Sequence, residues 1–257
     1  MSKMFTEERH NEILNVLNNE GKVVVNDLSE KFNVTKDCIR KDLKILEKRN
    51  LLKRTYGGAV PIRKSALYEN IDERRNLNLE SKAMIAEKAF NLIENNETVF
   101  LDISTTNILL AKLISKSDKK LTVVTNMLDI ISVINSNEND IKIICPGGIV
   151  NKALNGFTGS MTIESILNYR FSKAFIGSCG INIFDKSITT FDFDDGNTKK
   201  AVIKNSKTIY LVMENKKFYF DGSFKFATLN DIDAIVTEDY PGKDIANILD
   251  KVNVELI

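Results

Sequence analysis

The sequence has 257 residues, of which 43% are hydrophobic and 28% charged, with a formal net charge of +1, and these values fit one or two globular domains with a buried core. The first residues contain no apolar stretch like that of a secretory signal, and no run of about 18 apolar residues occurs, so the sequence excludes a membrane-spanning helix. Three widely separated cysteines, Cys38, Cys145 and Cys179, exclude a disulfide framework and a zinc site, and together these features predict a cytoplasmic protein.

The charge is unevenly distributed along the chain. Residues 1–63 carry 13 basic and 9 acidic side chains, whereas residues 64–257 carry 23 basic and 26 acidic ones. This asymmetry predicts a small basic module joined to a larger, nearly neutral one. Charge alone leaves a second interpretation open, because basic runs are also common on solvated helix faces.

The spacing of apolar residues predicts three short helices in the basic module. The first spans about 6–21 and is followed by a β-branched segment at 23–25. Asn26 is expected to cap the second helix and Thr35 the third, with a tight turn at 32–34 between them. One face of the third helix is apolar through Ile39, Leu43 and Leu46. Two helices joined in this way form a helix-turn-helix.

The other face of the third helix is basic. Residues 36–63 contain nine lysines and arginines against three acids, and an α-helix fits the major groove of B-DNA, where such side chains reach phosphates and guanine edges. The segment that follows predicts two short strands around a glycine turn, and thus a winged helix-turn-helix. Arg40 is the first candidate for a base contact. The predicted DNA-binding residues are Thr35, Lys36, Asp37, Cys38, Arg40, Lys41, Lys44, Arg54, Tyr56 and Gly57.

Residues 6–60 closely resemble, without gaps, the DNA-binding domain of the DeoR family of bacterial transcriptional repressors. The motifs that carry the resemblance are "TEER", "IRKDL" and the wing "GGAV". Two positions depart from the family, with Cys38 where threonine is usual and Tyr56 where histidine is usual. Both positions face DNA in the family, so the resemblance implies a conserved fold with an altered operator preference.

The rest of the chain predicts a second, α/β domain. Residues 63–80 are polar with weak periodicity and are expected to link a winged helix-turn-helix domain at 1–62 to an effector-sensing domain at 81–257. Apolar, β-branched runs alternate there with helical stretches, which is typical of a mostly parallel sheet. The runs lie at 97–102, 121–125, 141–145, 173–177, 208–213 and 233–237. The helices are expected at 81–94, 106–116, 127–136, 160–168, 195–206 and 243–251.

Small polar residues follow several of these runs, and ligands of parallel sheets bind beyond the carboxyl ends of the strands. Ser104, Thr105 and Thr106 offer hydroxyl and N–H groups at a helix start, which suits a phosphate, although a plain helix cap is the alternative. Asp102, Thr125, Asn126, Gly147, Gly148, Gly177, Cys179, Gly180 and Asp192 lie in comparable loops. There is no P-loop, no G-x-G-x-x-G and no EF-hand spacing, so neither a cofactor nor a metal is predicted.

This half also resembles the effector-sensing domain of the DeoR family over almost its whole length. The family's D-x-G-T-T appears as "DISTT", its G-x-x-G as "GSCG" and its D-S-S-K-F as "ENKKF". The resemblance implies a fold similar to sugar-phosphate isomerases, a phosphorylated sugar as ligand, and ligand contacts from Lys199 and Lys217. Ser104 stands where the family has glycine, and its Cβ is expected to narrow the phosphate loop. Glu214 stands where the family has aspartate.

The sequence thus predicts a sugar-responsive transcriptional repressor, an oligomer whose basic helix and wing bind operator DNA. The phosphosugar is expected to act through Asp102 and Lys199 without either residue contributing to DNA affinity. Two alternatives remain open. One is a sugar-phosphate isomerase with an attached DNA module, for which the sole histidine, His10, is expected on the surface and unsuited to catalysis. The other is a repressor that has lost its response to an effector.

Overall fold

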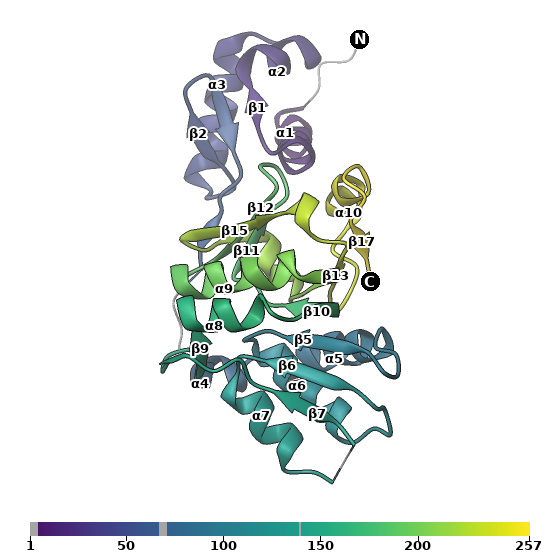
Figure 1. The fold of residues 1–257 in the computed structure, drawn as a ribbon. Coiled ribbons are helices and arrows are strands. Elements are labelled where there is room, and N and C mark those ends of the chain that lie inside the picture. Colours follow the sequence, from purple (N-terminus) through teal and green to yellow (C-terminus); the bar gives the residue numbers. More distant parts are fainter. Residues whose placement is uncertain (1–4, 67–70, 139) are drawn as a thin grey trace. The chain divides into compact units, whose positions relative to one another are not determined.

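The computed structural model describes residues 5–66, 71–138 and 140–257, and the chain divides into two compact units, Met1–Lys64 and Ser65–Ile257 (Figure 1). The sequence predicts a linker at 63–80. In the structure, residues 71–75 of this segment form a short helix in the second unit, and the next helix begins at Leu79, two residues earlier than predicted. The segment is held because Ile71 is buried and its N–H donates to Ala153 O at 3.0 Å.

The first unit is a winged helix-turn-helix, as predicted. Its elements are α1 (Thr6–Glu20), β1 (Val23–Val24), α2 (Val25–Lys31), α3 (Lys36–Lys48), β2 (Lys53–Thr55) and β3 (Gly58–Val60). Thr35 caps α3, since its Oγ accepts from the Cys38 N–H at 3.2 Å. Helix α2 begins at Val25, two residues earlier than a cap at Asn26 implies, and its N-cap is Val24. The Val25 N–H donates to Gly57 O and the Val25 side chain is buried, so Asn26 lies within the helix and does not cap it.

The three strands of this unit form one antiparallel sheet in the order β1-β3-β2. Gly58 is required where β3 passes β1, because a Cβ at this position would lie 1.9 Å from Val23 O. Gly57 has a φ of +84° and forms the turn between β2 and β3. The glycine pair therefore makes the wing possible.

A buried carboxylate joins α1 to α3. Asp42 Oδ2 accepts from Arg9 Nε at 2.6 Å, and Asp42 Oδ1 lies 3.1 Å from His10 Nε2. All three side chains are buried, so the expectation that His10 lies on the surface is wrong. The apolar spacing of α1 did not reveal this, because the histidine is buried by a polar partner from another helix.

The second unit is an α/β domain around a seven-stranded sheet with the order β17-β16-β13-β10-β5-β6-β7, and neighbouring strands of this sheet pair in parallel. The strands are β5 (Thr98–Leu101), β6 (Thr122–Thr125), β7 (Lys142–Ile144), β10 (Phe171–Ile176), β13 (Ser206–Val212), β16 (Ala234–Val236) and β17 (Glu255–Leu256). The six predicted apolar runs are all confirmed as strands of this sheet. The last strand was not predicted.

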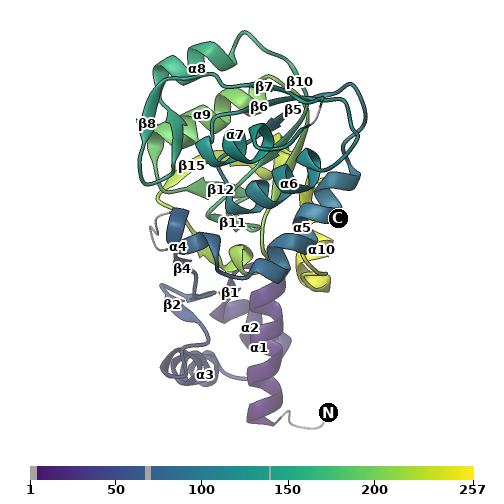
Figure 2. The same ribbon diagram turned by 90° about the horizontal axis from the view of Figure 1, so that it is seen from below.

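Helices cover both faces of this sheet (Figures 1 and 2). They are α4 (Ile71–Arg75), α5 (Leu79–Asn91), α6 (Thr105–Ser115), α7 (Leu128–Asn135), α8 (Ser160–Ile166), α9 (Phe193–Lys204) and α10 (Lys243–Asp250). Successive residues of a strand point to opposite faces of the sheet, so they pack into two separate hydrophobic cores. Val99 and Leu101 pack with α5, α6 and α7, whereas Phe100 packs with α8, α9 and α10. The predicted α/β class is confirmed.

Short antiparallel strands, absent from the prediction, supplement the main sheet. They are the β8–β9 hairpin (Ile149–Asn151 and Gly156–Thr158) and the three-stranded sheet β11-β12-β15 (Gly180–Asn182, Ser187–Thr190 and Phe224–Thr228). The described part of the chain also contains the two-residue strands β4 (Lys64–Ser65) and β14 (Phe220–Asp221) and the 3-10 helices η1 (Asn215–Tyr219) and η2 (Leu229–Asp231). Among these elements, β11, β12 and η1 follow the carboxyl ends of β10 and β13 along the chain.

Candidate functional site

The outer face of α3 carries the predicted DNA-contacting side chains. Lys36, Asp37, Arg40, Lys41 and Lys44 are all exposed there. Arg40 Nη1 lies 2.7 Å from Asp37 Oδ1 in an exposed ion pair of the same helix. Such a pair is weak in water and can be exchanged for a contact with a phosphate or a base.

The remaining predicted DNA-binding residues differ in how accessible they are. The Tyr56 side chain is fully exposed beside Gly57 at the tip of the wing. Arg54 is exposed, and its Nε lies 3.4 Å from Glu47 Oε2 of α3. Cys38 is half-buried, with its Sγ 3.9 Å from the buried Asp42 carboxylate. The hydroxyl of Thr35 is engaged in capping, so this residue positions α3.

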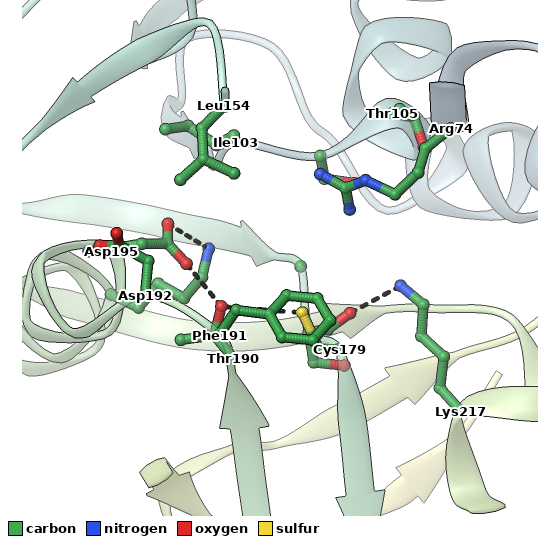
Figure 3. A pocket seen from close by; sticks show the side chains of 14 residues that line it. Arg74, Ile103, Thr105, Leu154, Cys179, Thr190, Phe191, Asp192, Asp195 and Lys217 are labelled. Carbon is green, nitrogen blue, oxygen red and sulfur yellow. Dashed lines mark hydrogen bonds and ion pairs between the residues drawn. The ribbon is translucent and has the colours of Figure 1, made fainter. Parts of the chain in front are cut away.

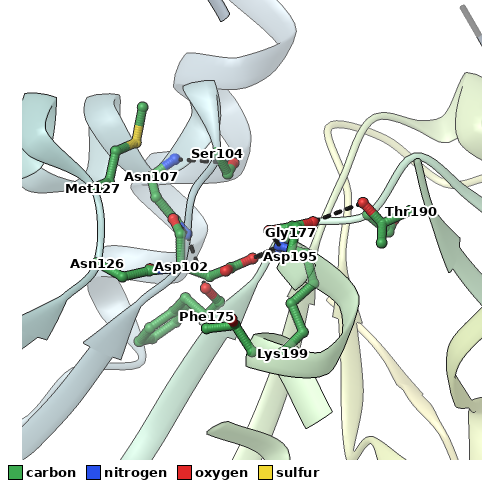
Figure 4. Close-up of polar contacts among 12 residues, drawn as sticks. Asp102, Ser104, Asn107, Asn126, Met127, Phe175, Gly177, Thr190, Asp195 and Lys199 are labelled. Atoms are coloured by element: carbon green, nitrogen blue, oxygen red, sulfur yellow. Dashed lines mark hydrogen bonds and ion pairs between the residues drawn. The ribbon is translucent and has the colours of Figure 1, made fainter. Parts of the chain in front are cut away.

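A second group of polar residues gathers in the α/β unit, around a buried ion pair (Figure 4). Lys199 Nζ of α9 lies 2.5 Å from Asp102 Oδ2 at the end of β5, and 3.1 Å from Asp195 Oδ1. The other oxygen of Asp195 accepts from the Thr190 hydroxyl at 2.7 Å, and Asp102 Oδ2 accepts from the Gly177 N–H at 2.8 Å. The network ties β5, β10, β12 and α9 together.

The pKa values of the central pair follow from burial and mutual attraction. Burial raises the pKa of Asp102 to about 6, even though Lys199 and the Gly177 N–H favour its ionised form. For Lys199, burial favours the neutral amine, but the two carboxylates outweigh it and raise the pKa above the ordinary value. The lysine is therefore charged, and it is enclosed by two acids.

A cavity lies beside this network (Figure 3). Its enclosed inner part is lined by Arg74, Ile103, Ser104, Thr105, Leu154, Gly177, Ser178, Cys179, Thr190, Phe191, Asp192, Asp195, Lys199 and Lys217. It continues into an outer part with a volume of about 300 Å³, and the two parts share Arg74, Thr105, Ser178, Cys179, Phe191 and Lys217. The cavity lies at the carboxyl ends of β5, β10 and β13, where ligands of parallel sheets bind.

Half of the predicted effector residues line the inner cavity. They are Ser104, Thr105, Gly177, Cys179, Asp192, Lys199 and Lys217. Asp192 is the N-cap of α9, with Oδ1 accepting from the Asp195 N–H at 2.9 Å. Lys217 Nζ donates to Ser178 O at 2.6 Å, and burial lowers the pKa of this lysine to about 8. Burial also raises the pKa of the Cys179 thiol, so this cysteine is protonated near neutral pH.

The other predicted effector residues do not line the inner cavity. They are Asp102, Thr106, Thr125, Asn126, Gly147, Gly148 and Gly180. Several of them hold loops in place instead. Thr125 Oγ1 donates to Leu101 O, Asn126 Nδ2 donates to Phe157 O, and Gly147 O accepts from the Thr162 hydroxyl. A Cβ on Gly180 would lie 1.9 Å from Phe220 O, so close strand packing explains this glycine.

Ser104 itself caps the helix that follows it. Its Oγ accepts from the N–H groups of Thr106 and Asn107, at 3.1 and 3.4 Å. Its backbone is extended, with φ at −163°, so a side chain is accommodated here without strain. Ser104 Cβ lies against Gly177, where an added Cβ would lie 2.9 Å from it, so this glycine leaves room for the serine. The plain helix cap that the sequence left open is therefore present at α6.

Arg74 is the cavity residue that the sequence prediction missed most clearly. It lies in α4, within the predicted linker, and its Nε is buried without a hydrogen-bond partner in the described part of the chain. Thr190, Asp195 and Phe191 lie next to the predicted Asp192 and were recognisable from that motif. For Arg74 the only signal was its position in the charged run "DERR".

In the described residues no group of three or more histidine, cysteine, aspartate or glutamate side chains is arranged to hold a metal ion. None of the helices in the same residues has both the length and the apolarity that a bilayer span needs.

Comparisons with known proteins agree with this division of the chain. A family model described as the DeoR-like helix-turn-helix domain matches residues 9–65, and one described as the DeoR C terminal sensor domain matches residues 77–239. The glycerol-3-phosphate regulon repressor of Escherichia coli (strain K12) is 30% identical over 249 residues, which are 97% of each chain. The transcriptional repressor GlcR of Bacillus subtilis (strain 168) is 31% identical over 254 residues, covering 99% of this chain and 96% of the relative.

Among solved structures, the ribose 5-phosphate isomerase A of Methanocaldococcus jannaschii matches with a TM-score of 0.41 and 12% identity, over 55% of this chain and 54% of the isomerase. At this level of similarity the likeness indicates neither a substrate nor an activity.

The fold, with its exposed basic helix and its separate α/β sensor domain, defines a DNA-binding transcriptional regulator. The chain belongs to the DeoR family, since both family models match it and relatives at least 30% identical align along nearly its whole length. The family resemblance read from the sequence is confirmed.

Proposed function

We propose that this regulator is a repressor whose α/β unit binds a phosphorylated sugar or polyol and thereby alters operator binding. The observation that carries the proposal is the cavity at the sheet edge, in the part of the chain that matches a sensor domain. Lys217 supplies a cation and Asp192 a carboxylate that can accept from hydroxyl groups. A small ligand with an anionic group and several hydroxyls complements such a cavity.

The relatives support this class of ligand. The Escherichia coli relative is named for the glycerol-3-phosphate regulon, and a further relative, 28% identical, is named a putative aga operon repressor. The operator contact is assigned to the exposed face of α3 and to the wing. Most of the DNA affinity then comes from phosphate contacts, so it should fall steeply as salt rises.

Two measurements test the proposal. Genomic fragments that include the DNA upstream of the protein's own gene are tested by gel shift at several salt concentrations, with and without phosphosugars. Melting temperatures are recorded in parallel with glycerol 3-phosphate, ribose 5-phosphate and fructose 6-phosphate, because a ligand stabilises the state it binds. Absence of DNA binding at low salt would contradict the regulator assignment, whereas absence of any thermal shift would favour a repressor that no longer responds to these ligands.

We also propose that the cavity does not catalyse turnover. An isomerase needs a free general base near the substrate carbon. Asp102 and Asp195 are both engaged with Lys199, Asp192 caps α9 by accepting from the Asp195 N–H, and the sole histidine is buried in the other unit. Incubation of the protein with pentose and hexose phosphates tests this, and appearance of the isomeric sugar would overturn it.

The proposal includes a homo-oligomer, a dimer or a tetramer, that acts in the cytoplasm, where the operator DNA is. Two helix-turn-helix units read two half-sites about one helical turn apart, so an oligomer fits a palindromic operator. Light scattering of the purified chain, alone and with operator DNA, measures the number of subunits. A monomer on a single half-site would contradict this part.

A further inference from the structure

Arg74 comes from a different part of the chain than the other residues that line the inner cavity. The others follow β5 in the chain, on strand ends, loops and helices of the α/β unit, whereas Arg74 lies in α4, between the DNA-binding unit and the first strand of the sheet. Lys64 is the last residue of the DNA-binding unit and α4 begins at Ile71. A contact to Arg74 would therefore act on the segment that joins the two units along the chain.

Among residues 5–66, 71–138 and 140–257, the Arg74 side chain has no carboxylate partner. No ion pair or hydrogen bond of its guanidinium is recorded in the described part of the chain, and its Nε is buried. Figure 3 shows the guanidinium and the ammonium of Lys217 on facing walls of the cavity, both directed toward its interior. The charge of Arg74 disfavours the protonated form of Lys217, and an anion bound between the two cations would relieve that repulsion.

The backbone of this segment, in contrast, is anchored at several points. Arg74 O accepts from Lys82 Nζ at 2.5 Å, Ile71 N–H donates to Ala153 O, and Asn78 Nδ2 donates to Glu214 Oε1 at 2.5 Å. The neighbouring Arg75 is already paired, since its Nη2 lies 2.5 Å from Asp129 Oδ1. Helix α4 thus holds one arginine in a structural ion pair and presents the other to the cavity.

We propose that Arg74 binds the anionic group of the effector together with Lys217, and that this contact couples the cavity to the 71–78 segment. This inference rests on the proposed sensing function and assigns a ligand contact to a residue outside the strand-end motifs. In the absence of ligand the segment is held by these hydrogen bonds, by the Arg75–Asp129 ion pair and by the buried Ile71 side chain. With ligand bound, the Arg74 side chain adds a charge-assisted contact that orders it further.

The test compares Arg74→Gln with Arg75→Gln, which makes the same change of charge one residue along the same helix. Phosphosugar affinity is measured on the full-length protein by titration calorimetry, with inorganic phosphate as a minimal anion. Loss of one charge-assisted contact is expected to weaken binding about 10- to 100-fold in Arg74→Gln and to leave Arg75→Gln near wild type. Arg74→Lys, which keeps the charge, should recover part of the affinity.

Hydrogen exchange supplies the second readout. Ligand should slow exchange of the Ile71 and Leu77 amides in the wild type but not in Arg74→Gln at saturating ligand. Equal affinities in Arg74→Gln and wild type would overturn the inference while leaving the sensing function intact. If no phosphosugar or phosphate binds the wild type, the proposed ligand class fails and this inference fails with it, whereas operator binding is decided separately by gel shift.

Discussion

Arg40 stands in the centre of the exposed face of α3, where its guanidinium is held by Asp37 of the preceding turn. Replacement by alanine should weaken operator binding by about 1–3 kcal/mol if the side chain reads a base edge. Gel-shift titrations on the operator and on a scrambled fragment measure this change. Lys207→Ala, which removes one exposed positive charge from the other unit, is the control. Unchanged operator affinity in Arg40→Ala would remove this residue from the readout.

Lys199 is the only cation that the described structure records against the buried carboxylates of Asp102 and Asp195. In Lys199→Met both buried carboxylates lose their cationic partner, so the free energy of unfolding should fall by about 3–5 kcal/mol. Urea unfolding followed by circular dichroism measures this loss. Lys200→Met, at the exposed neighbouring position, should change stability by no more than about 0.5 kcal/mol. Equal stability of both variants would mean that the buried pair is not needed.

Residue identities were easier to predict than residue roles. The loop motifs and the family resemblance predicted Asp192 and Lys217 as effector residues, and both line the inner cavity. They also suggested that Asp102 and Lys199 sense the ligand, but motif spacing does not show that two distant residues pair with each other inside the fold. Because that pair is buried, its removal is expected to affect stability before it affects sensing. Arg74 was not predicted as a cavity residue because a helix of five residues is too short to show the apolar periodicity of a helix.

At the scale of elements, Asp42 of α3 links this helix to α1 through buried polar contacts. Its carboxylate binds Arg9 and contacts His10, and all three side chains are buried. In Asp42→Ala the Arg9 guanidinium stays buried without its carboxylate partner. We therefore expect the free energy of unfolding of the DNA-binding unit to fall by about 3–5 kcal/mol. Thermal unfolding of the full-length chain should show an earlier transition for this unit. Asp37→Ala, on the exposed face of the same helix, should leave that transition in place.

Element type followed from the sequence wherever the pattern was long enough. The six predicted strands appear as apolar runs in the sequence because helices cover both faces of the parallel sheet, and the stretches between these runs were predicted as helices. The β8–β9 hairpin and the sheet β11-β12-β15 were not predicted, since strands of three to five residues carry too few positions to show a period. Their pairing depends on contacts between distant segments, which no local pattern contains.

At the scale of the whole molecule, the affinity for an anionic ligand depends on the protonation state of Lys217, which the fold controls by burying this side chain. Lys217 has an ordinary pKa of 10.5, which burial lowers to about 8. Between these two values the unfolded chain binds the proton and the folded unit does not, so this group makes the unliganded unit more stable as pH rises through that window. An anion, in contrast, binds the protonated lysine.

Effector affinity should therefore not change with the titration of Lys217 below about pH 8, where the lysine is already protonated, and should fall by up to about tenfold per pH unit above it, because the free protein must take up a proton to bind. The ligand does not cause this change, since a phosphate monoester is already a dianion above about pH 7. Titration calorimetry from pH 7 to 9.5, in buffers of different ionisation enthalpy, measures both the affinity and the proton uptake. Lys217→Met should bind more weakly at pH 7 and lose the pH dependence, whereas Lys207→Met should keep it. A flat profile in the wild type would place the anion away from Lys217, and operator release measured across the same range would then be equally insensitive to pH.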